Sequence, residues 1–280
     1  MEFFTPPPRS FVVVALALMG VFGSLGIAST AQAVTLYATG FEQPTFQPGD
    51  QLLGLDGWST AVPPFLNPAA AIITNAAAKS GTQSVEVHGA DLIGSDGITA
   101  PYDAVGSYRR PLLDQNGEPN GHTMTGGKKL ARVDANLMLE TNQKKTKGEF
   151  FSLTISPRSG NGESYGEIGL SSDGTVEAFG FNAAPATDRV FARPIRFNKW
   201  YHITMLIDFA NRTTSYFIDD QFIGAVPAPS SSDLLLRCAM LVFARPDGDV
   251  SGGPSSKRAN YTARFDNFRV SVHSSAPEID

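Results

Sequence analysis

The chain has 280 residues, a net charge of −5, a pI near 5.4 and one cysteine. Its acidic balance argues against nucleic acid as a partner, because phosphate neutralisation needs a basic stripe and the longest basic run is the KKTK of residues 144–147. A single cysteine excludes an intrachain disulfide framework. Cys238 lies in the apolar stretch RCAMLVFAR and is predicted to be a small buried strand residue.

The first residues have the features of a cleaved targeting signal. Arg9 precedes an apolar run over residues 11–27, and AQA at residues 31–33 is a small-residue cleavage site. We predict a signal peptide over residues 1–33 and a single domain over residues 34–280. The alternative is an uncleaved membrane anchor, since the run is near the short limit for a spanning helix. The expected location is secreted, periplasmic or at the cell surface, without stable membrane insertion after cleavage.

Strand-like segments recur along residues 34–280, separated by NG, DG, GG and SG turns. They fall at residues 35–38, 71–74, 83–88, 106–110, 130–139, 149–156, 165–170, 175–181, 197–224, 238–244 and 263–272. Two Ala- or Leu-rich stretches, 68–78 and 230–236, are long enough for no more than a helical turn. The spacing predicts an all-β fold of two packed antiparallel sheets.

The strongest pattern is the segment FNKWYHITMLIDFANRTTSYFIDDQFIG, residues 197–224. Apolar side chains at 201, 203, 205, 207 and 209 alternate with polar ones, which is the period of a half-buried strand. A second β-branched and aromatic run follows at residues 213–218, and Asp219 and Asp220 then supply a turn. The segment predicts a meander of antiparallel strands, with Trp200 in the core where the first strand begins.

This segment resembles the laminin G-like and pentraxin-like members of the concanavalin A-like lectin/glucanase superfamily. The resemblance rests on a Trp-Tyr-His start, an alternating strand that ends in Asp208, and a YxD turn at Tyr216. Asp220 departs from the family pattern, which has Gly there. Two further segments extend the likeness: ATGFEQPTFQPGDQLLGLDGW with SGTQS near the start, and YTARFDNFRVSV near the end. The resemblance implies an exported jelly-roll sandwich with a lectin-like scaffold.

Motifs for catalysis are missing from the sequence. The ExDxxE pattern of the superfamily's glucanases is absent, and Glu163 and Glu167 are read as exposed charges. Glu86 and His88 have the spacing of the QxH pair of the related alginate lyases, with Glu in place of Gln, and are read as surface residues. No Ser/His/Asp order, HExxH or Cys/His metal spacing occurs. We therefore predict no catalytic residue.

A calcium ion is the one cofactor that the sequence suggests. Asp266 shares a face with Phe268, Val270 and Val272, and a carboxylate buried among apolar groups needs a hydrogen-bond partner, a cation or a raised pKa. If the first and last strands pair, Glu42 approaches Asp266, and together they offer hard oxygen ligands. The alternative is that Asp266 caps backbone amides of a neighbouring turn.

Glycan recognition needs aromatic faces for sugar rings and polar groups for hydroxyls. Four aromatic residues lie outside the firmest strands, namely Trp58, Tyr102, Tyr108 and Tyr165. The long segment 89–128 also carries polar groups, and it gives the predicted ligand site Tyr102, Tyr108, Arg109, Asn120 and His122.

The sequence thus predicts an exported, non-catalytic, lectin-like domain that binds a glycan or another cell-surface component. Two alternatives stay open. A polysaccharide hydrolase or lyase requires clustered acidic, His or Tyr side chains on one sheet, and a structural or adhesive subunit requires a large apolar patch and an exposed sheet edge. In that second case the partner is an envelope or extracellular assembly, with self-assembly included.

Overall fold

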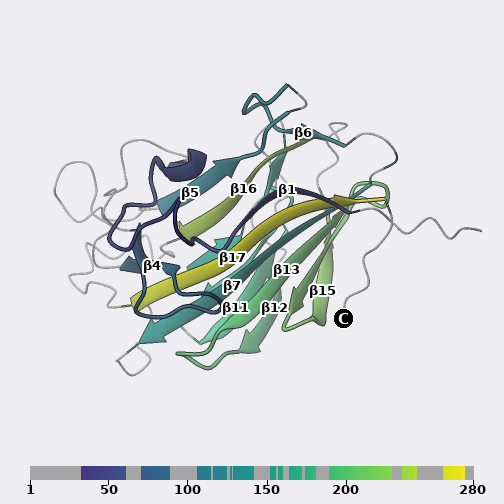
Figure 1. The fold of residues 1–280 in the computed structure, drawn as a ribbon. Coiled ribbons are helices and arrows are strands. Elements are labelled where there is room, and N and C mark those ends of the chain that lie inside the picture. Colours follow the sequence, from purple (N-terminus) through teal and green to yellow (C-terminus); the bar gives the residue numbers. More distant parts are fainter. Residues whose placement is uncertain are drawn as a thin grey trace, which may run out of the picture. The chain divides into compact units, whose positions relative to one another are not determined.

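A computed structural model provides the structure of the protein (Figure 1). It describes residues 33–60, 71–88, 106–114, 116–124, 127, 129–141, 152–155, 157–159, 164–171, 174–180, 189–228, 235–244 and 261–274. All belong to one compact unit, residues 31–280. The predicted signal peptide lies outside the described residues apart from Ala33.

Two antiparallel sheets make up the described part of the chain. The eight-stranded sheet A has the order β15-β14-β13-β7-β17-β4-β3, and β1 pairs with β17 beside that path. Its strands are β1 (Val34–Thr39), β3 (Ala71–Thr74), β4 (Ser84–His88), β7 (Leu130–Thr141), β13 (Tyr201–Asp208), β14 (Thr213–Ile218), β15 (Gln221–Pro227) and β17 (Tyr261–His273). The condition set for the approach of Glu42 to Asp266, that the first and last strands pair, is met.

The nine-stranded sheet B has the order β12-β11-β10-β8-β16-β5-β2, and β6 and β9 pair with β16 beside that path. Its strands are β2 (Ser59–Thr60), β5 (Gly106–Pro111), β6 (His122–Thr123), β8 (Ser152–Ile155), β9 (Arg158–Ser159), β10 (Glu167–Ser171), β11 (Thr175–Phe179), β12 (Arg189–Pro194) and β16 (Leu235–Ala244). A short 3₁₀ turn, η1 (Leu55–Gly57), precedes β2. The predicted all-β, two-sheet antiparallel sandwich is confirmed.

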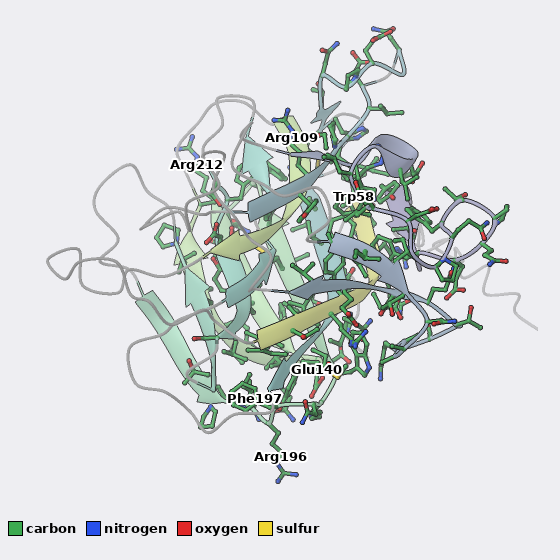
Figure 2. All side chains as sticks on the ribbon, turned by 90° about the vertical axis from the view of Figure 1, so that its left-hand side faces the viewer. Trp58, Arg109, Glu140, Arg196, Phe197 and Arg212 are labelled. Carbon is green, nitrogen blue, oxygen red and sulfur yellow. The ribbon has the colours of Figure 1, made fainter. Side chains whose placement is uncertain are left out.

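The core lies between the sheets and follows the alternation of the strands. On β13 the buried side chains are Tyr201, Ile203, Met205 and Ile207, as the sequence period predicts. An aromatic cluster closes the core where β1 and β17 meet. Trp58 packs against Tyr37, Phe41 and Phe268 with ring centroids 5.4 to 6.2 Å apart. Figure 2 shows Trp58 among the side chains between the strands.

A β-bulge in β17 corrects the predicted position of Asp266. The register with β7 shifts between Asp266 and Arg269, and Asn267 takes a positive φ of 52°. The extra residue brings both Phe265 and Phe268 into the core. Asp266 therefore does not share a face with Phe268.

The predicted strand at residues 71–74 is confirmed as β3. The strand β12 was not among the predicted strand segments. Trp200 is only partly buried, because β13 begins at Tyr201 and it is the Tyr201 ring that occupies the core.

The turn between β14 and β15 has a defined conformation. Ile218 pairs with Gln221, so the turn has two central residues, Asp219 and Asp220, with φ of 47° and 61°. Positive φ at both central positions is the mark of a type I′ hairpin turn, which matches strand twist. Asp219 Oδ1 also accepts a 3.0 Å hydrogen bond from the His202 amide. Asp220 therefore fills, in the left-handed conformation, the place where the family pattern has Gly.

Candidate functional site

The face of sheet A turned away from the core, here called the outer face, is polar. Alternation along β7 places Val133, Ala135 and Leu137 in the core, so the residues between them point to the other side. Strand pairing sets residues of β13, β17 and β4 beside these. The resulting polar set is Arg132, Asp134, Asn136 and Glu140 of β7, His202 and Thr204 of β13, Arg264 of β17, and Glu86 of β4.

Asp134 is the centre of the first network on the outer face. Arg132 Nε donates to both of its carboxylate oxygens, at 2.8 and 3.0 Å. Thr204 Oγ1 donates to Asp134 Oδ1 at 2.7 Å, and His202 Nε2 lies 3.3 Å from the same oxygen. The other ring nitrogen, His202 Nδ1, lies 3.2 Å from Asp220 Oδ1. Two carboxylates therefore hold the imidazole.

The charges of this network favour an imidazolium facing a carboxylate. Burial alone would raise the pKa of Asp134, but hydrogen bonds from His202 and Thr204 and the Arg132 guanidinium outweigh it and hold that pKa below its ordinary value. The hydrogen bond to Asp134 raises the pKa of His202, against the opposing effect of burial. His202 therefore keeps its proton to higher pH than a free histidine does, with both ring nitrogens directed at carboxylates.

Arg264 is the centre of a second network. Its guanidinium makes an ion pair with Glu86 on β4. Arg264 Nε and Nη2 also donate to the two oxygens of Glu140 on β7, at 2.8 and 3.3 Å. The Arg264 side chain is only 8% exposed, so one buried cation is shared by two carboxylates. Figure 2 labels Glu140, which comes from the C-terminal end of β7.

One end of the outer face carries an exposed aromatic ring. Phe222 of β15 is 61% exposed, and Phe217 of β14 supports it edge-on with centroids 5.5 Å apart. Phe217 is paired with Thr204, which bonds Asp134. Phe217 is buried, yet it lies outside the cluster of core residues. Phe222 therefore lies in one cross-strand row with Phe217 and Thr204, and this row ends at the Asp134 network.

The predicted ligand residues of segment 89–128 do not form one site in the described part of the chain. Tyr108 is fully buried in the core, where no sugar ring can stack on it. Arg109 Nε donates to Ser59 at 3.2 Å, and Asn120 Nδ2 donates to Asp114 at 3.0 Å within a local turn. His122 begins β6. Tyr102 lies outside the described residues.

The other aromatic candidates take part in packing. Trp58 and Tyr165 are 1% and 2% exposed, so neither offers a face to a ligand. The sequence treated Glu86 as a surface residue, whereas the structure pairs it with Arg264. The side chains of His88 and Cys238 lie outside what the structure describes, as does Glu163.

The structure brings Glu42 and Asp266 to the same turn, residues 79–83. Asp266 Oδ2 accepts hydrogen bonds from the amides of Lys79 and Ser80 at 2.8 and 3.1 Å, and Asp266 Oδ1 accepts one from Asn267. Glu42 Oε1 accepts from the amides of Thr82 and Gln83, and Oε2 from the Thr82 hydroxyl.

Every oxygen of these two carboxylates therefore already accepts a hydrogen bond. Calcium takes six to eight oxygen ligands, so the residues around this turn fit the ion poorly as they are arranged. Within the described residues, no group of three or more His, Cys, Asp or Glu side chains is placed to hold a metal ion. A calcium ion shared by Glu42 and Asp266 stays a prediction.

Burial raises the pKa of Asp266, with the nearby Glu42 charge adding to it and the three amide hydrogen bonds opposing it.

None of the helices in the described ranges is long and apolar enough to cross a membrane.

Comparisons with known proteins support the fold. No protein-family model and no curated protein matches the sequence. A solved carbohydrate esterase from the Shiga toxin-encoding bacteriophage phi24B aligns with a TM-score of 0.53 and 13% identity, over 86% of this chain and 99% of that one. The cellulose induced protein Cip1 aligns with a TM-score of 0.51 and 13% identity, over 84% and 96%.

A sialidase aligns at a TM-score of 0.41 and 13% identity, over 76% of this chain, which spans only 17% of the sialidase. At that score the likeness carries no argument. Identities this low show a shared fold and nothing about activity. The described part of the chain is therefore an antiparallel β-sandwich of the jelly-roll type.

Proposed function

We propose that this protein binds a glycan, without cleaving it, through the outer face of sheet A. The observation that carries the proposal is Phe222, a large aromatic ring that is 61% exposed and fixed edge-on by Phe217. An exposed ring presents a flat apolar surface, and a sugar presents a matching apolar face. The polar groups that a sugar's hydroxyls require lie in the same row of side chains.

Asp220 and the His202 ring beside it supply the polar surface. The His202 side chain is 29% exposed and Asp220 is 41% exposed, so both are accessible from solvent. Asp220 accepts from a sugar hydroxyl through the carboxylate oxygen that His202 does not contact. Their mutual contacts hold both groups in place before a ligand arrives, which lowers the entropic cost of binding.

A polysaccharide hydrolase or lyase is the second candidate, because the outer face gathers the acidic and histidine side chains that such an enzyme requires. Two observations favour binding instead. Glu86 and Glu140 are both engaged by Arg264, so neither is available as a general acid without leaving that partner. The raised pKa of His202 favours imidazolium, which cannot act as a general base.

The assembly alternative requires a large apolar patch. Among the described residues only Leu113 and Phe222 are large, apolar and exposed; Phe222 lies on β15 of sheet A, whereas Leu113 lies in the segment that follows β5 of sheet B. The proposal includes export, which rests on the signal-like residues 1–33, and places the glycan partner outside the plasma membrane.

Affinity electrophoresis through gels that contain a panel of neutral and acidic polysaccharides tests the proposal. We expect the wild-type protein to be retarded by at least one polysaccharide and to release no reducing or unsaturated ends. Phe222→Ala should lose about tenfold or more in affinity, as expected when a stacking surface is removed. Leu113→Ala is the matched control, because Leu113 is the other large exposed apolar side chain at 48%.

Retardation that is identical in Phe222→Ala and wild type would overturn the proposed face. Absence of retardation by every polysaccharide would overturn glycan binding itself. Release of new reducing or unsaturated chain ends would instead support the polysaccharide hydrolase or lyase.

A further inference from the structure

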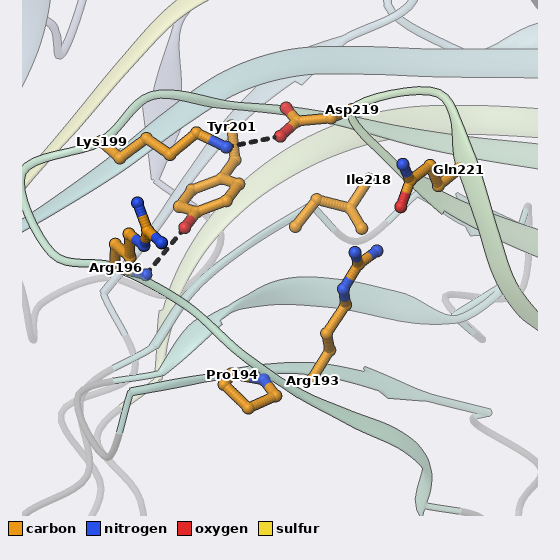
Figure 3. Close-up of a pocket in the computed structure, with 8 residues that line it drawn as sticks. All are labelled: Arg193, Pro194, Arg196, Lys199, Tyr201, Ile218, Asp219 and Gln221. Atoms are coloured by element: carbon orange, nitrogen blue, oxygen red, sulfur yellow. Dashed lines mark hydrogen bonds and ion pairs between the residues drawn. The ribbon is translucent and has the colours of Figure 1, made fainter.

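A cavity of about 290 Å³ lies on the other side of the β14–β15 turn from Phe222. It is lined by Arg193 and Pro194 of β12, by Arg196, Lys199 and Tyr201, and by Ile218, Asp219 and Gln221 of the hairpin. The cavity therefore opens where the edge strand of sheet B meets the edge hairpin of sheet A (Figure 3). Its volume is at the lower end of the range for small-ligand sites, which suits one sugar unit.

The lining is strongly cationic although the chain as a whole is acidic. Three of its side chains are positively charged and one, Asp219, is negative, so its formal charge is +2 against −5 for the chain. Lys199 Nζ lies 2.9 Å from Asp219 Oδ2, and that pair neutralises itself. In the part of the chain that the structure describes, neither Arg193 nor Arg196 makes an ion pair. Two guanidinium groups thus remain without a counter-charge beside one cavity.

Tyr201 fixes the geometry of this cavity. Its hydroxyl oxygen accepts a 2.7 Å hydrogen bond from the Arg196 amide, and the Lys199 ammonium sits 4.3 Å from its ring centroid. The phenol proton finds no acceptor among the described side chains and backbone. Figure 3 shows the hydroxyl directed at Arg196 and Arg193 rising beneath Ile218 and Gln221. A hydroxyl donor and two guanidinium forks therefore line the same hollow.

We infer that this cavity is an anion subsite, so that the glycan bound by the outer face is an acidic one. The inference rests on the proposed function and names its ligand class. Guanidinium groups recognise carboxylate and sulfate oxygens with paired hydrogen bonds, and Tyr201 adds a neutral donor. The ligand chemistry is a sugar that carries a carboxylate or a sulfate ester.

The hairpin connects the two surfaces. Gln221 and Phe222 are successive residues of β15, so their side chains point to opposite faces of the strand. Gln221 lines the cavity and Phe222 belongs to the outer face. A polysaccharide that passes over the edge of β15 places one unit on the ring and the anionic group of another in the cavity.

The test compares Arg193→Gln and Arg196→Gln, singly and together, with the control Arg212→Gln. Arg212 is an exposed arginine in the turn before β14, so its substitution removes the same charge far from the cavity, as Figure 2 shows for Arg196 and Arg212. Calorimetric titration uses polygalacturonate for the carboxylate, dextran sulfate for the sulfate, dextran for the neutral polymer and inorganic phosphate as a free anion.

We expect wild type to prefer one of the two acidic polymers over dextran, with an affinity that falls as salt rises. Each cavity substitution should weaken that binding about tenfold, which is what the loss of one charged hydrogen bond predicts. Arg212→Gln should bind as wild type does. The carboxylate and sulfate arms identify which group occupies the cavity, and phosphate binding equal to that of the polymers would overturn the assignment to a sugar.

The failure of this inference differs from that of the proposed function. Equal binding of neutral and acidic polymers, unchanged by Arg193→Gln and Arg196→Gln but lost in Phe222→Ala, would overturn the anion subsite and leave glycan binding intact. Equal weakening by Arg212→Gln would reduce the effect to overall charge and would also overturn the subsite. If the wild-type protein binds none of the polymers, both the anion subsite and the proposed glycan binding are overturned.

Discussion

Gly81 is the position where a single added methyl should be most informative about the turn between β3 and β4, which Glu42 and Asp266 both contact. Its φ is +64°, and a Cβ built there falls 2.2 Å from Glu42 Oε1 and 2.8 Å from the carboxyl carbon. A real Cβ cannot approach this closely, so in Gly81→Ala the Glu42 side chain must move. Its hydrogen bonds to Thr82 and Gln83 are then weakened or lost.

The expected cost has two parts. A positive φ disfavours alanine by about 1 kcal/mol relative to glycine. The displaced Glu42 loses up to three hydrogen bonds, which at this exposed site are together worth about 1–2 kcal/mol. Gly81→Ala should therefore lower the unfolding free energy by about 2–3 kcal/mol in a urea titration followed by circular dichroism.

Two controls isolate the Glu42 contribution. Gly117 also has a positive φ, +83°, but a Cβ there meets nothing within 4 Å, so Gly117→Ala should show the backbone cost alone. In a Glu42→Ala background, Gly81→Ala should likewise cost only the backbone part, which a double-mutant cycle measures. Equal costs for Gly81→Ala and Gly117→Ala, or additivity with Glu42→Ala, would show that Glu42 does not occupy this turn.

Three further predictions follow from the described contacts. The raised pKa of His202 implies that its contribution to stability is complete below the unfolded pKa of about 6.5 and is lost as pH rises through the folded pKa, so His202→Gln should cost about 1 kcal/mol at pH 5.5 and much less at pH 9 by urea titration; a constant cost would refute the charged pair. Trp58→Ala should remove about 3–5 kcal/mol by opening a cavity in the aromatic cluster, whereas Trp58→Phe, which keeps an aromatic ring, should cost clearly less; similar costs would argue against the packing account. A calcium ion shared by Glu42 and Asp266 predicts that excess calcium raises the melting temperature and a chelator reverses the rise; an unchanged melting temperature would leave Asp266 as a turn cap.

Strand alternation predicted the elements of the core because burial on one face imposes a period of two. It succeeded on β13 and β7, where every second residue is apolar. It failed at Asp266, because a bulge inserts one residue and reverses the alternation without a distinctive sequence signal beyond Asn267 at a positive φ. It also missed β12, an edge strand that ends in Pro194 and pairs on one side only with β11.

The candidate site was less predictable than the fold because its contacts join residues far apart in the chain. Arg264 and Glu140 are separated by 124 residues, and only the register of β17 against β7 brings them together. The polar residues of ARVDANLMLE at alternate positions indicate a polar face, but not its partners. The sequence instead favoured Tyr108, an aromatic residue in a long segment, although neighbours on other strands bury it.

In the hairpin of β14 and β15, the residues that pack the core can be separated from those available for binding. Core packing requires Tyr216 and Ile218 on the inner face of the hairpin. The sandwich core therefore fixes the shape of the hairpin, whatever the protein binds. The residues that packing leaves free are those of the opposite face and the turn, and these are Phe222, Asp219 and Asp220. Asp219 bonds both the His202 amide and Lys199, so one turn residue positions a group on the outer face and a group in the cationic cavity. That shared tie is the physical reason to treat the ring and the cavity as two parts of one binding surface.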